Sequence, residues 1–152
     1  MANFLDIEQL NQEEELGCSY DLVFVGTPID ERGQASIEKA KIAAKQLIEV
    51  HYDQETFCLF AQGRLFSANP RGLRQFTEAF PATRLLVEAT TLEFPEILLL
   101  IKAYLSVESL EIGFFYVEPE SYEKRVGQDA EDLHAFALRD GYRAFSPIPG
   151  FT

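Results

Sequence analysis

Short apolar runs alternate four times along the chain with amphipathic runs of helical periodicity. The apolar runs are rich in Leu, Val and Phe, as expected of strands that are covered on both faces of a sheet. Strand and helix in strict alternation favour a parallel sheet with helices on both faces, built from right-handed crossovers. This order therefore predicts an α/β fold.

The expected architecture is a Rossmann-like three-layer sandwich with a mainly parallel sheet. Asn69 followed by Pro70 is typical of a helix start, because Asn caps free amides and proline suits the first helical position. The predicted strands include residues 22–26, 57–60, 85–88 and 112–117. The predicted helices cover 35–50, 69–80 and 93–106, and a further helical turn begins at Pro119.

The length of 152 residues suits one domain, which we expect to cover 20–152. Residues 1–19 are polar and acidic, with Phe4, Ile7 and Leu10 at helical spacing. They are expected to form a short helix or an arm that packs elsewhere. The Pro- and Gly-rich end of the chain is typical of a loop. We therefore expect either that the chain belongs to a longer protein or that its tail docks on a partner.

The formal net charge of −12 disfavours duplex DNA and anionic membranes as main partners, because such polyanions would be repelled. A small nucleotide in a local pocket is compatible with this charge, since helix N-termini and a few arginines act locally. The N-terminal residues lack a signal-peptide pattern, and the longest apolar stretch is short and contains Lys102. We expect a cytoplasmic protein with a protein partner or a homo-oligomer.

The cysteines and histidines are few and isolated in the sequence. Cys18 and Cys58 form no CxxC pair, so both are expected to be reduced and at least half-buried. His51 and His134 are far apart and lie in no HxH or HExxH pattern. The sequence therefore predicts no metal site and no bound cofactor.

Polar residues follow three of the predicted strands. The carboxyl edge of an open parallel sheet is where ligands bind, and the three loops are expected to meet there. The residues concerned are Gly26, Thr27, Asp30, Glu31 and Arg32 after the first strand, Glu88, Thr90, Thr91 and Glu93 after the third, and Glu118, Glu120 and Tyr122 after the fourth.

The loop after the first strand has two interpretations. It lacks the glycine pattern of a dinucleotide- or NTP-binding loop. The structural interpretation is a tight turn followed by a helix cap from Asp30, Glu31 or Ser36. In the functional interpretation, Thr27 and Arg32 bind an anionic ligand, because a guanidinium suits phosphate.

The junction after the third strand also has two interpretations. Thr90 or Thr91 can cap the next helix, and Glu93 would then favour its positive end. The same two hydroxyls can instead hold a phosphate or a ribose. Glu88 ends an apolar strand, so its carboxylate must be exposed at the edge or paired. In a closed cleft its pKa would be raised, which would make it a possible acid or base.

Two further groups carry binding chemistry. Glu118 occupies the position on the fourth strand that corresponds to Glu88, and Tyr122 could stack on a ligand. Four arginines gather around the second crossover and could bind a phosphate or an acidic surface, or form salt bridges with neighbouring helices. They are Arg64, Arg71, Arg74 and Arg84.

The strand ending in "VFVGT" and the later strand–"EATT"–helix junction resemble the CRISPR-associated Rossmann fold (CARF) and SAVED sensor domains of prokaryotic immunity. In those families the corresponding loops hold a cyclic oligonucleotide. The resemblance implies a nucleotide-sensing module in an antiviral defence system. It also implies that Thr27, Arg32, Thr90 and Thr91 contact the ligand.

The chain also resembles nucleoside deoxyribosyltransferases, which carry a glutamate nucleophile at the start of a later helix. This second resemblance implies that Glu96 or Glu93 is that nucleophile. The third alternative is a structural subunit of a larger complex. Glu88, Glu93 and Glu96 distinguish these classes, because an enzyme needs one of them in a closed cleft.

Overall fold

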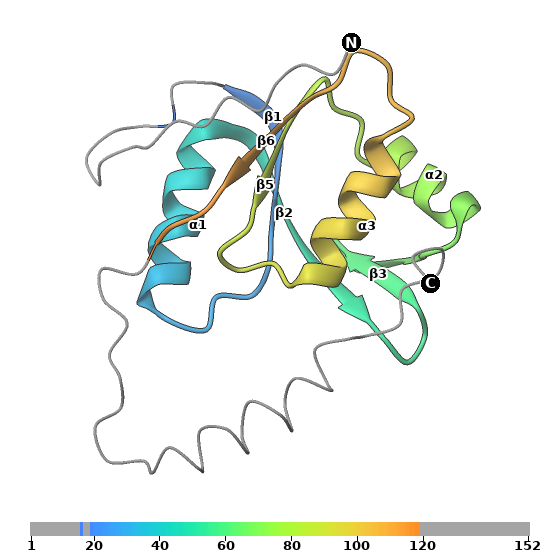
Figure 1. Ribbon diagram of the computed structural model, residues 1–152, viewed down its shortest axis with the longest axis horizontal. Coiled ribbons are helices and arrows are strands. Elements are labelled where there is room, and N and C mark those ends of the chain that lie inside the picture. Colours follow the sequence, from blue (N-terminus) through green and yellow to red (C-terminus); the bar gives the residue numbers. More distant parts are fainter. Residues whose placement is uncertain (1–15, 17–18, 119–152) are drawn as a thin grey trace.

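The computed structural model describes residue 16 and residues 19–118. These residues form one β-sheet with helices on both of its faces (Figure 1). In chain order the elements are β1 (Tyr20–Val25), α1 (Glu31–Ala43), β2 (Ala44–Asp53), β3 (Cys58–Ala61), β4 (Arg64–Ser67), α2 (Pro70–Ala79), β5 (Arg84–Glu88), α3 (Phe94–Tyr104) and β6 (Glu111–Phe115).

The six strands form one mixed sheet in the order β4-β3-β2-β1-β5-β6. β1 is parallel to β2 and β5, and β5 is parallel to β6. β3 is antiparallel to both β2 and β4. The predicted α/β fold is therefore confirmed, and the predicted strands 85–88 and 112–117 are parallel to each other. The prediction of a mainly parallel sheet is wrong.

The predicted helix over 35–50 is wrong in its second half. α1 ends at Ala43, and β2 begins at the next residue. From there the burial alternates with a period of two: Ile48, Val50 and Tyr52 are buried. The intervening residues are exposed, which is the pattern of a strand rather than a helix. β2 thus fills the position beside β1.

The predicted parallel strand over 57–60 is the first half of a β-hairpin. β3 and β4 are joined by Gln62 and Gly63, whose φ angles are 48° and 75°. Positive φ at both central residues is the requirement of the tight hairpin turns that match strand twist. The chain therefore reverses, and β4 becomes the outermost strand on this side.

Helices cover the two faces of the sheet. α1 lies on one face, and α2 and α3 lie on the other (Figure 1). Alternate residues of β1 serve the two cores: Val23 packs with residues of α1, and Phe24 packs in the larger core beneath α2 and α3. In that larger core the ring of Phe24 lies 5.4 Å from that of Phe76. The central parallel strands β1 and β5 are thereby buried on both faces, as their composition predicts, whereas β2 and β6 keep exposed residues.

The start of α2 follows the sequence prediction, whereas α1 starts at Glu31, earlier than the predicted residue 35, and its cap is one of the three predicted candidates. The side chain of Asp30 accepts a hydrogen bond from the Gly33 amide at 2.7 Å and caps α1. Asn69 does the same for the Gly72 amide at 2.8 Å and caps α2. The N-cap of α3 is Glu93, which makes no side-chain capping hydrogen bond. The prediction that Thr90 or Thr91 caps this helix is wrong.

Several predictions fall on residues outside the described part of the chain. They concern the N-terminal arm, Cys18, the helical turn at Pro119, Glu120, Tyr122 and His134. Within residues 19–118, no helix has the length and apolar character needed to cross a membrane.

Candidate functional site

Glu88, the last residue of β5, is completely buried at the strand-to-helix junction. Its Oε1 accepts hydrogen bonds from the Ser36 hydroxyl at 2.5 Å and from the Thr90 amide at 2.8 Å. Its Oε2 accepts hydrogen bonds from the amide of Thr91 at 3.1 Å and from the hydroxyl of the same residue. Neutral donors therefore occupy both oxygens, and among the described residues no cation pairs with this carboxylate.

The hydrogen bonds of Glu88 extend to the ends of three strands. Thr91 Oγ1 accepts the amide of Gly26, the residue after β1, at 2.8 Å. Thr90 Oγ1 accepts the amide of Val117, just beyond β6, at 2.9 Å. A Cβ at Gly26 would lie 2.1 Å from the Thr91 carbonyl oxygen, so this close approach requires glycine. The carboxyl ends of β1, β5 and β6 are thus tied together through one buried carboxylate.

This network explains why the two threonines do not cap α3. Both hydroxyls point back to the sheet, where Glu88 needs donors because an unpaired buried carboxylate is costly. The first turn of α3 contains Pro95, which has no amide hydrogen to be capped. The sequence identified the right residues, but the buried carboxylate decides which groups they bind.

A second group of residues lies at the surface of the same edge. Arg32 Nη1 donates to the Tyr116 hydroxyl at 3.4 Å, and its Cζ lies 5.8 Å from the centre of that ring. The Nε of Arg32 is 3.9 Å from a carboxylate oxygen of Asp30. This Nε is buried and has no hydrogen-bond acceptor among the described residues. Arg32 therefore keeps donor capacity beside an aromatic ring that is 50% exposed.

Tyr116 did not figure in the sequence analysis. Its signal was its place: it ends the "FFY" stretch of the predicted fourth strand, at the carboxyl edge. Which loop it would face depends on β6 pairing with β5, and this pairing places it across from the β1–α1 loop. Glu118, a predicted ligand contact, is exposed two residues further on.

Thr27 lies in the same loop as Arg32 but turns toward the other neighbour of β1. Its hydroxyl donates to Glu49 of β2 at 2.9 Å, and the pair is exposed. The structure therefore brings Arg32 to the β6 side and Thr27 to the β2 side of the loop.

Glu96, in the first turn of α3, is the second buried carboxylate, with 3% exposure. Its Oε1 accepts the Tyr52 amide at 2.8 Å and lies 3.8 Å from His51 Nδ1. Its Oε2 is buried and has no partner among the described residues. Burial raises the pKa of Glu96, and the exposed Glu93 nearby acts in the same direction. The hydrogen bond from the Tyr52 amide opposes this rise in the pKa.

The arginines of the second crossover have different surroundings. Arg84 makes two hydrogen bonds to Glu111 of β6, at 3.0 and 3.1 Å, so it forms a salt bridge, but with a neighbouring strand and not with a helix as predicted. Arg64, Arg71 and Arg74 are exposed and form no ion pair with any residue that the structure describes.

Metal ligands do not cluster in the described part of the chain. No group of three or more His, Cys, Asp or Glu side chains there could hold a metal ion. Cys58 is a free, half-buried thiol. The arrangement at the sheet edge is thus a buried carboxylate with both oxygens hydrogen-bonded, beside a half-buried arginine and an exposed tyrosine. No protein-family model matches this chain, and neither a curated protein nor a solved structure has significant similarity to it.

Proposed function

We propose that this chain is a Rossmann-like, three-layer binding module that holds a small nucleotide at the carboxyl edge of its parallel strands and does not alter it chemically. The observation that carries this proposal is the Arg32–Tyr116 pair. A phosphate can bind the partly exposed guanidinium of Arg32 and the nearby amides at the start of α1. A base can stack on the exposed ring of Tyr116.

The state of Glu88 supports binding rather than catalysis. A general base or nucleophile must reach the reacting atom, and this carboxylate has no exposed surface. Its lone pairs are already used by Ser36, Thr90 and Thr91. In this proposal the network positions the ends of the strands, while the ligand contacts Arg32 and Tyr116.

The other predicted ligand contacts fit this proposal in different ways. Thr27 and Glu118 are exposed at the edge and could approach a ligand directly. Thr90 and Thr91 are half-buried and would act through Glu88. On the basis of the resemblance to CARF and SAVED sensor domains, the proposal also assigns the module to a prokaryotic defence system. It also suggests a cyclic oligonucleotide as the ligand.

The test is calorimetric titration of the full chain with a cyclic oligoadenylate and, separately, with AMP. Arg32→Ala should weaken binding about tenfold or more, because a hydrogen bond to a charged group contributes about 1.5–3 kcal/mol. Lys41→Ala is the matched control, since it removes an exposed cation from the same helix. Absence of binding to the unmodified protein, or equal loss in both variants, would rule the proposal out.

A nucleoside deoxyribosyltransferase-like activity is the second candidate, and Glu96 favours it. A buried carboxylate with a free oxygen and a raised pKa is typical of a catalytic acid. Its 3% exposure argues against direct attack on a substrate. Incubation with deoxyadenosine and free cytosine, followed by chromatography, would reveal base exchange. The activity must disappear in Glu96→Ala to support this candidate.

A further inference from the structure

β4 is the terminal strand of the sheet, and its outer side has no strand beside it among the described residues. Ala61 and Arg64 flank the two-residue turn and so form a hydrogen-bonded pair. In an antiparallel pair, hydrogen-bonded and non-hydrogen-bonded residue pairs alternate. The hydrogen bond of 2.9 Å from the Ala68 amide to the Phe57 carbonyl agrees with this alternation, so Leu65 belongs to a non-hydrogen-bonded pair. The amide and carbonyl of Leu65 therefore point away from β3 and are available to another strand.

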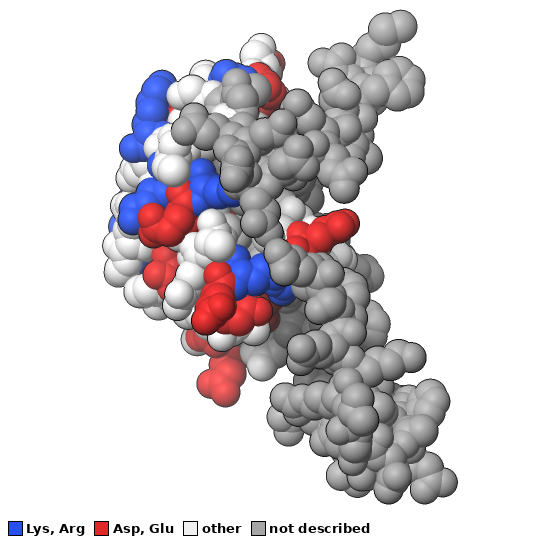
Figure 2. Space-filling view, turned by 90° about the vertical axis from the view of Figure 1, so that its left-hand side faces the viewer, with Lys and Arg blue, Asp and Glu red and all other residues white. Residues whose placement is uncertain are grey.

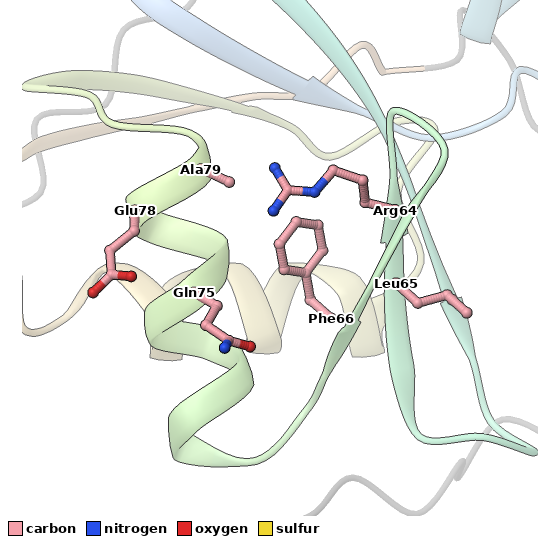
Figure 3. A pocket seen from close by; sticks show the side chains of 6 residues that line it. All are labelled: Arg64, Leu65, Phe66, Gln75, Glu78 and Ala79. Atoms are coloured by element: carbon pink, nitrogen blue, oxygen red, sulfur yellow. The ribbon is translucent and has the colours of Figure 1, made fainter.

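One face of this edge opens into a groove that has Arg64 in its lining and Arg71 beside it. The groove lies between β4 and α2 and has a volume of about 360 Å³ (Figure 3). The guanidinium of Arg64 lies over the ring of Phe66, with its Cζ 4.8 Å from the ring centre. Arg71 precedes Gln75 of the groove by one helical turn, so both lie on one side of α2. Glu78 is the acidic residue in the groove lining.

The cations beside this groove differ from those on the α1 side of the molecule. On that side, lysines and arginines lie among acidic residues (Figure 2). Lys41 contacts Glu38 at 3.5 Å, and Lys45 contacts Asp21 at 2.8 Å. Arg64 and Arg71 have no such partner in the part of the chain that the structure describes. An acidic segment would supply the missing charge.

The opposite face of the same edge is apolar. Leu65 is 63% exposed, and its cross-strand neighbour Phe60 is 44% exposed. Figure 3 shows Leu65 pointing away from Arg64 and Phe66. Natural sheets protect their edges with charges and avoid exposed apolar side chains there. The charge at Arg64 and the shortness of β4 fit such protection, but the exposed Leu65 and Phe60 do not.

We infer that the outer edge of β4 binds residues 4–8 of this chain, "FLDIE", as an added antiparallel or parallel strand. This segment lies outside the described residues. Side chains alternate across a strand, so Asp6 and Glu8 would face the arginines of the groove while Leu5 and Ile7 would cover Leu65 and Phe60. Residues 1–15 contain no lysine or arginine that would oppose this contact. The inference is independent of the nucleotide site proposed above.

The experiment uses the full chain with Phe4 replaced by the photoreactive p-benzoylphenylalanine. After irradiation, mass spectrometry should place the cross-links on β4 and α2. The double substitution Arg64→Glu with Arg71→Glu should lower their yield about tenfold, because attraction becomes repulsion at two positions. The matched control is Lys39→Glu with Lys41→Glu, which changes the net charge equally on α1 and should leave the yield unchanged.

A charge exchange distinguishes docking from misfolding. Asp6→Arg with Glu8→Arg, added to the two arginine substitutions, should restore the cross-links to β4 and α2. A mixture of isotopically light and heavy chains identifies which copy supplies the segment, and either origin supports the inference. Cross-links to other elements, or a yield that does not respond to the charge of Arg64 and Arg71, would overturn it.

Discussion

Two carboxylates are buried in the described part of the chain, both near the start of α3, and their surroundings are opposite. Glu88, at the end of β5, accepts four hydrogen bonds from Ser36, Thr90 and Thr91. Glu96, in the first turn of α3, accepts one from the Tyr52 amide, and its second oxygen has no partner among the described residues. Burial is nearly the same at both positions, 0% and 3% exposed.

Burial alone therefore does not make a carboxylate reactive. The number and placement of hydrogen-bond donors decide whether a buried carboxylate has a structural role or keeps an oxygen atom that can take part in chemistry. By this criterion Glu88 has a structural role and joins the strand ends, whereas Glu96 keeps one oxygen that accepts no hydrogen bond from the described residues.

Glu88→Ala should lower the free energy of unfolding by about 3–5 kcal/mol, because it leaves buried donors unpaired and opens a cavity. Urea denaturation followed by circular dichroism measures this loss. Glu93→Ala is the matched control: it is the same change on an exposed residue without a side-chain capping bond, and it should stay within about 0.5 kcal/mol. A loss below about 1 kcal/mol at Glu88 would show that the network contributes little.

Thr91→Val should lower the free energy of unfolding by about 1–3 kcal/mol, because the Gly26 amide loses its acceptor and Glu88 loses a donor. Thr90→Val should have an effect in the same range, since the Val117 amide depends on that hydroxyl. Both threonines should therefore matter, whereas a simple helix cap would need one of them. Thermal unfolding of the two variants decides this, and one silent variant would contradict the shared network.

Glu96→Gln should change how stability depends on pH. The folded state raises the pKa of Glu96 above its ordinary value of 4.5. Below that value both states are protonated; as the pH rises through the window up to the folded pKa, the unfolded state releases its proton first and the original protein loses stability. The variant lacks this loss, so it should gain in relative stability as the pH rises. Parallel pH profiles of the two proteins would refute the assignment.

Thr27→Val should have the smallest effect, within about 0.5 kcal/mol, because the bond from Thr27 to Glu49 is exposed. It is the same substitution as at Thr91, one strand away, and so measures what burial adds to a threonine hydrogen bond. Thermal unfolding under identical conditions provides the comparison. Equal losses at Thr27 and Thr91 would remove the distinction between the surface and the buried network.

Local chemistry in the sequence was enough to predict several parts of this protein. Asn69 with Pro70, and Asp30 before α1, specify helix starts through contacts within three residues, so neighbouring elements have little influence on them. The continuous apolar runs of 85–88 and 112–117 likewise predicted strands; the first is buried on both faces, and the second, β6 at the edge of the sheet, is only half-buried. The polar cluster around Glu88 was identifiable because a carboxylate at the end of such a strand needs partners.

Tertiary structure decided the rest. Residues 44–50 continue a helical pattern locally. They form β2 instead because a strand beside β1 can pair with it and bury alternate side chains. The partners of Thr90 and Thr91 lie 54 and 65 positions away, in Ser36 and Gly26, so a local capping rule could not anticipate them. The Arg32–Tyr116 pair likewise spans 84 positions and exists because β6 joins the sheet beside β5. Contacts of this range depend on strand order, which local periodicity does not encode.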